Sequence, residues 1–165
     1  MTKKSKILTG VILLAVVALV LAFLFWPRSF PQIMGKDYDP DQLREITVYL
    51  SQVREAGRTR VVELSPEDSA TEELLSLLED WTYTPVHQIG STTGYTIPFD
   101  YRVSLCMVFQ KQEDGYPGGT LYFDGYPHIE IAGTGGKHGT YKLSQDQQQQ
   151  LLDLLLAQPY EEQTP

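Results

Sequence analysis

The chain has 165 residues, 42% of them hydrophobic, and a formal net charge of −8. Residues 1–28 carry four cations and no carboxylate, so the remaining nine cations and twenty-one carboxylates give the rest of the chain a charge of −12. With an uncharged run over residues 7–26, these numbers argue against a wholly soluble protein, a multidomain enzyme, and a binder of polyanions that acts through net charge.

A transmembrane helix is predicted over residues 7–26, which would make the protein single-pass. At about 1.5 Å per residue, this run matches the roughly 30 Å hydrocarbon core of a bilayer. Three lysines precede it, which predicts a cytoplasmic tail over residues 1–6 and an extracytoplasmic carboxyl-terminal part at the cell membrane. A cleaved signal peptide is the alternative, but cutting after Ala22 would leave a strongly apolar new terminus.

Residues 27–42 are predicted to form a stem, because prolines, a glycine and aspartates occur there without apolar periodicity. One domain follows over residues 43–158. Alternating apolar residues at 46–50 and 61–64 predict a β-hairpin. A helix is expected to begin at Ser65 and Pro66, and its apolar positions, spaced by three and four, predict one buried stripe.

Four strands and a last helix are predicted in the second half of the domain. The strands are expected at YRVSLCMVFQ, TLYFD, HIEIA and GTYKL, and a capping box of Ser144 and Gln147 begins the helix. The fold class is therefore α+β: a two-layer sandwich of an antiparallel sheet of about six strands, in the order ββα-ββββα, with two amphipathic helices packed on it. Residues 159–165 are expected to form a disordered tail.

The long irregular segment over residues 82–100 is the best candidate for a functional loop. Tyrosines in predicted loops supply amphipathic contact area, and a phenylalanine joins them. The predicted binding residues are Tyr83, Tyr95, Phe99, Tyr116 and Tyr126. Arginines around the first hairpin turn suggest an anion-binding or docking patch of Arg54, Arg58 and Arg60, although ordinary pairing with neighbouring glutamates is the favoured explanation.

Signatures of catalysis, metal binding and cofactor binding are incomplete in this sequence. The glycine-rich residues 133–139 lack the Ser or Thr that a phosphate loop requires and precede a strand, so no nucleotide or other cofactor is predicted. His87, His128 and His138 give no convincing metal site, and Cys106 lies mid-strand without a nearby base. His128 and Glu130 share a strand face, which leaves an envelope hydrolase with a carboxylate and histidine centre as an alternative function.

The layout as a whole resembles that of small, single-pass, uncharacterised extracytoplasmic proteins of Gram-positive-type bacteria. That resemblance implies a location and no chemistry. The expected function is a membrane-anchored, extracytoplasmic, non-enzymatic binding or regulatory module that contacts an envelope protein or a cell-wall polymer and not nucleic acid. A structural protein that self-associates through its edge strands is a further alternative.

Overall fold

The structure is a computed structural model that describes residues 3–53, 58–86, 100–109, 118–124 and 128–163. Four helices, two short 3₁₀ turns and eight strands make up these residues. The helices are α1 (Lys3–Leu24), α2 (Phe30–Met34), α3 (Ser69–Asp80) and α4 (Gln145–Leu156), and the turns are η1 (Pro40–Gln42) and η2 (Thr134–Gly136). The strands are β1 (Leu43–Gln52), β2 (Thr59–Leu64), β3 (Thr84–Pro85), β4 (Tyr101–Phe109), β5 (Gly118–Phe123), β6 (His128–Ala132), β7 (His138–Lys142) and β8 (Glu161–Gln163).

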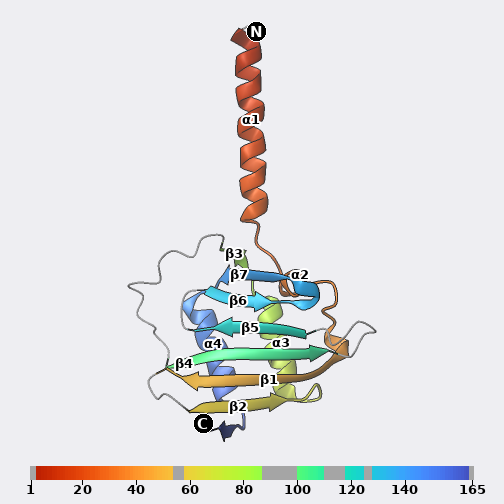
Figure 1. Ribbon diagram of the computed structural model, residues 1–165, viewed down its shortest axis with the longest axis vertical. Coiled ribbons are helices and arrows are strands. Elements are labelled where there is room, and N and C mark those ends of the chain that lie inside the picture. The colour runs from red at the N-terminus through yellow and green to blue at the C-terminus, as the bar shows by residue number, and fades with distance from the viewer. Residues whose placement is uncertain (1–2, 54–57, 87–99, 110–117, 125–127, 164–165) are drawn as a thin grey trace.

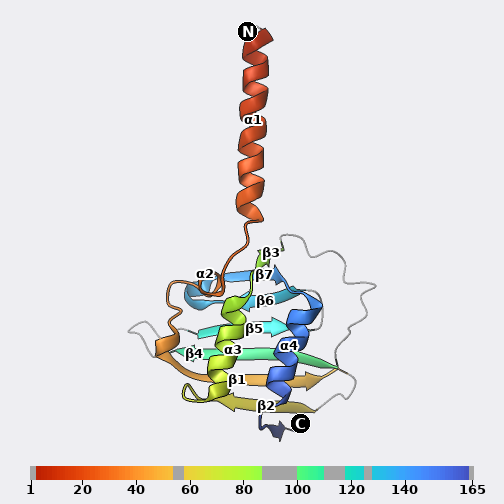
Figure 2. The same ribbon diagram turned by 180° about the vertical axis from the view of Figure 1, so that it is seen from behind.

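The eight strands form one antiparallel sheet in the order β3-β7-β6-β5-β4-β1-β2-β8. Helices α3 and α4 lie side by side across one face, behind the sheet in Figure 1 and in front of it in Figure 2. The α+β class and the antiparallel sheet agree with the prediction, but the predicted six strands are corrected to eight. The extra strands carry no apolar alternation, because β3 has only two residues and β8 is entirely exposed Glu-Glu-Gln.

The predicted transmembrane, single-pass helix over residues 7–26 is wrong. No helix in the described part of the chain is both long and apolar enough to cross a membrane. Helix α1 does not coincide with the uncharged run, because it takes lysines into its first turns and ends at Leu24, before Phe25 and Trp26. It projects away from the domain beyond the sheet edge formed by β3 and β7 (Figure 1).

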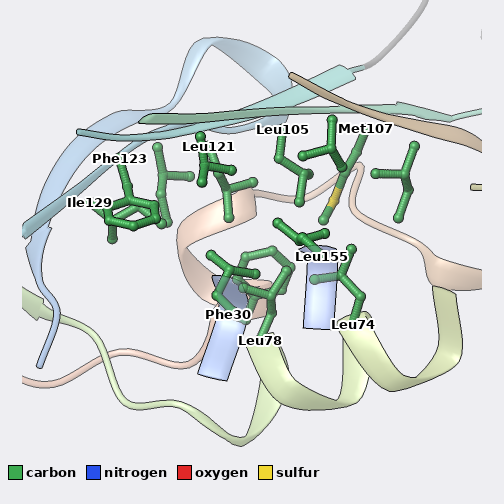
Figure 3. Close-up of a cluster of buried hydrophobic side chains, with 14 of the residues drawn as sticks. Phe30, Leu74, Leu78, Leu105, Met107, Leu121, Phe123, Ile129 and Leu155 are labelled. Carbon is green, nitrogen blue, oxygen red and sulfur yellow. The ribbon is translucent and has the colours of Figure 1, made fainter. Parts of the chain in front are cut away.

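The core lies between the sheet and the helices (Figure 3). Alternate residues of β4, including Leu105 and Met107, point toward Leu74 and Leu78 of α3 and Leu155 of α4, and all five are at most 1% exposed. Fully burying one such side chain contributes about 1.5–3 kcal/mol. The spacing of leucines along both helices therefore fixes which face of each helix meets the sheet.

The capping box predicted for the last helix is present. The backbone N–H of Gln147 donates to Ser144 Oγ at 3.2 Å, and the backbone N–H of Ser144 donates to Gln147 Oε1 at 2.9 Å. These bonds satisfy two groups that would otherwise lack partners at the amino end of α4. The first turn of α4 is thereby fixed where the chain leaves β7.

The segment predicted as a stem is packed into the domain. Phe30, Ile33 and Met34 of α2 are at most 2% exposed and belong to the main core. Arg28 forms a β-bridge with Tyr83, with backbone hydrogen bonds of 2.9 Å in both directions. The apolar side chains of α2, separated by a proline and a glutamine, pack into the core instead of belonging to a solvated linker.

The glycine-rich turn between β6 and β7 holds α2 in place. Thr134 Oγ1 donates to the carbonyl oxygen of Met34 at 3.0 Å, and Lys137 Nζ donates to that of Gln32 at 2.9 Å. A β-carbon on Gly133 would collide with the Met34 carbonyl oxygen, so glycine is required for this close approach. The contacts described for this turn thus attach α2 to the sheet.

Candidate functional site

The face of the sheet opposite α3 and α4 is called here the open face. Because side chains alternate along a strand, every second residue of β1, β4, β5, β6 and β7 lies on it. In β4 the alternation is clear: Val103, Leu105 and Met107 are buried against the helices, whereas Ser104 and Cys106 on the open face are half-buried. No described helix covers this face in either view (Figures 1 and 2).

Residues paired across six strands form a straight line over the open face, called here the central row. The pairings run continuously from β2 to β7. The central row consists of Val61, Tyr49, Ser104, Tyr122, Glu130 and Thr140. Tyr49 and Tyr122 are each 38% exposed and flank Ser104, so two amphipathic rings and a hydroxyl lie at the middle of the face.

A second row beside the first is also uncharged at its middle. Thr47, Cys106 and Thr120 are paired with one another on β1, β4 and β5 and are all half-buried. Carboxylates lie farther out, with Glu63 at the β2 end of this row and Glu161 of β8 paired with Val61 of the central row. The middle of the open face therefore offers hydroxyls, one thiol and two aromatic rings, with carboxylates and the exposed cations Arg102 and Lys142 toward its margins.

Of the predicted binding residues, the structure describes only Tyr83. Its side chain is 0% exposed, and its hydroxyl donates to the carbonyl oxygen of Leu78 at 2.9 Å. This position in the core does not suit contact with a partner at the surface. The other predicted residues, Tyr95, Phe99, Tyr116 and Tyr126, lie outside the described residues, as does most of the 82–100 loop.

The predicted arginine patch is only partly described, because Arg54 lies outside the described residues. Arg58 is exposed. The guanidinium of Arg60 lies 4.3 Å from the ring centre of Tyr160 and 5.6 Å from that of Tyr101. Such contacts are the geometry of cation–π attraction, so Arg60 helps to attach the carboxyl-terminal segment to the sheet.

Three of the residues weighed for metal binding or hydrolysis lie on or beside the open face. His128 and Glu130 are both half-buried on β6, and His138 is exposed on β7, while His87 lies outside the described residues. Within the described ranges no group of three His, Cys, Asp or Glu residues is arranged to hold a metal ion.

Two tyrosines on the covered side have strongly altered acidity. Burial raises the pKa of Tyr38, and the hydrogen bond that its hydroxyl donates to Glu79 Oε1 at 2.8 Å raises it further, as does the charge of Glu79. Burial likewise raises the pKa of Tyr83, with a smaller contribution from Tyr38. Both phenols therefore stay protonated far above neutral pH, as expected of structural groups.

Sequence reasoning missed Tyr49 and Tyr122, although a signal was present. In ITVYL and TLYFD each tyrosine alternates with core residues, so its side chain points away from the core. A small polar residue at such a position would be enough to form the strand. Their pairing through Ser104 depends on the order of β1, β4 and β5, which the pattern alone does not specify. No protein-family model matches this chain, and comparisons with curated proteins and with solved structures found no match either.

Proposed function

We propose that the protein is a non-enzymatic binding or regulatory module, associated with a membrane surface, whose partner binds to the open face of the sheet. The observation that carries the proposal is the placement of Tyr49 and Tyr122 on either side of Ser104, in register and partly exposed. Tyrosine is enriched at binding surfaces because its ring supplies contact area while its hydroxyl supplies a hydrogen bond.

The sheet edges support binding at the face over self-association through strands. At one edge, β3 is two residues long and includes Pro85, which has no N–H to donate. At the other edge, β8 is three residues long and carries Glu161 and Glu162. Short, charged or proline-containing edge strands are features that oppose the addition of a further strand.

The membrane part of the proposal rests on the surface of α1. Its large apolar side chains are exposed along the described helix, including Leu14 at 71% and Phe23 at 74%. A continuous exposed apolar surface of this kind is typical of membrane or protein contact. The described residues of the polar, acidic domain do not pack over this apolar surface of α1.

The single cysteine of the chain gives a direct test of the open face. Cys106 lies two residues from Ser104 on β4, beside the two tyrosines. In membranes from cells that produce the full chain, N-ethylmaleimide is expected to alkylate Cys106 more slowly than in the purified protein, because a bound partner shields it. The chain itself is expected in the membrane pellet after centrifugation, and its recovery only in the supernatant would contradict the membrane association.

A matched control moves the thiol to the other side of the molecule. In the double variant Cys106→Ser, Gln150→Cys, the thiol lies on an exposed position of α4. Its alkylation rate is expected to be the same in membranes and in the purified protein. Equal rates for Cys106 in the two preparations would refute binding at the open face.

A further inference from the structure

We infer that the partner on the open face is an extended, neutral, β-1,4-linked polysaccharide, a conclusion that rests on the proposed function and names its ligand class. The inference begins from charge. Glu161 and Glu130 lie on either side of the Tyr49–Ser104–Tyr122 centre. Five strand spacings separate β8 from β6, so the two positions are about 24 Å apart. A polyanion laid along the central row would meet a carboxylate toward both ends of its path, while the nearest open-face cation of β4, Arg102, lies in the row beside it.

The chemistry of the centre separates a polysaccharide from a protein partner. Protein interfaces bury an apolar middle in which serine is depleted. Here the middle consists of tyrosine rings together with the hydroxyls of Ser104, Thr47 and Thr120. A sugar ring presents C–H groups on its flat side and hydroxyls around its rim, so it can stack on a tyrosine while hydrogen-bonding to serine and threonine.

The shape of the surface suits a linear chain. Tyr49 and Tyr122 are separated by two strand spacings, about 10 Å, with the small side chain of Ser104 between them. Two separate stacking positions with a low point between them match alternate sugar units of a straight polymer. The row continues past them to Thr140, so a chain longer than a disaccharide has further hydroxyls to contact.

Titration of the full chain with chitohexaose and with cellohexaose tests the inference by calorimetry. A zwitterionic detergent is required, because alkyl glycosides carry sugar headgroups that would compete. Wild type is expected to bind at least one hexasaccharide, and Tyr49→Ala, Tyr122→Ala to lower that affinity by roughly tenfold or more. The sugar is also expected to slow alkylation of Cys106, and oligogalacturonate, an anionic polysaccharide, is expected not to bind.

The control variant is Tyr160→Ala, since Tyr160 is also exposed but stacks on Arg60, away from the open face. It is expected to leave sugar affinity unchanged, and circular dichroism is used to check that each variant is folded. Binding of neither hexasaccharide, or equal binding by wild type and the double tyrosine variant, would overturn the inference. If Cys106 is nevertheless shielded in native membranes, the proposed function stands and only the ligand class is wrong.

Discussion

The two faces of the sheet are built from the same strands yet carry different chemistry. On β4, Leu105 and Met107 are fixed by the leucines of α3 and α4, which fill the space above them. Their neighbours Ser104 and Cys106 face away from the helices, and no described helix packs on them. Packing therefore constrains residue identity on the covered face. On the open face packing against a helix does not explain the tyrosines, serine and threonines, and the proposed binding of a partner does.

The largest contrast is expected from adjacent residues of one strand. Leu105→Ala should lower the free energy of unfolding by about 2–5 kcal/mol, because it leaves a cavity between the sheet and the helices. Ser104→Ala, one residue away on the open face, should change it by less than about 0.5 kcal/mol. Urea denaturation followed by circular dichroism measures both. Similar losses for the two variants would mean that the open face is covered in the free protein.

An intermediate effect is expected where α2 meets the covered side. Gly133→Ala places a methyl group against the carbonyl oxygens of Met34 and Ile33, and the latter is 2.8 Å from the new β-carbon. Relief requires α2 to shift, at a cost of about 1–3 kcal/mol in unfolding free energy. Gly10→Ala in α1, where a β-carbon meets no atom within 4 Å, is the control. Equal stability of the two variants would show that α2 is not held by this turn.

The smallest effect is a loss of stability at alkaline pH that arises from Tyr38 on the covered side. The pKa of Tyr38 is raised in the folded state, so its contribution is complete below the unfolded value of about 10 and is lost as pH rises above it. Tyr38→Phe should therefore flatten the decline in melting temperature above about pH 10. An unchanged slope in Tyr38→Phe would contradict this account.

Regular periodicity predicted most of the two-layer fold. The β1–β2 hairpin, β4 and α4 were expected close to their observed positions because their apolar residues repeat strictly and Ser144 begins the last helix. Helix α3 begins at Ser69 and not at Ser65, since the Asp68 carboxylate accepts a hydrogen bond from the Ser65 N–H and holds the preceding residues in a turn. Local capping alternatives of this kind are closely balanced in energy.

Other parts depend on contacts between distant residues and were not predictable from local patterns. Phe30, Ile33 and Met34 look like an irregular stretch among prolines until the β6–β7 turn is placed beside them. Strand β8 pairs with β2 although it has no apolar residue, and Tyr160 just before it stacks on Arg60. The open-face site arises from strand order, which brings Tyr49 and Tyr122 together although 73 positions separate them in the sequence.

The contacts that hold α2 also affect the order in which parts of the chain fold during synthesis. The carbonyl oxygen of Met34 accepts a hydrogen bond from a hydroxyl 100 residues farther along the chain. That of Gln32 accepts one from an ammonium group 105 residues farther along. Contacts of such long sequence separation form late, since the intervening chain must first be brought together. The apolar side chains of α2 therefore leave the ribosome long before the β6–β7 turn that packs against them has been synthesised. Chains that stop short of the β6–β7 turn are expected to aggregate rather than fold partially.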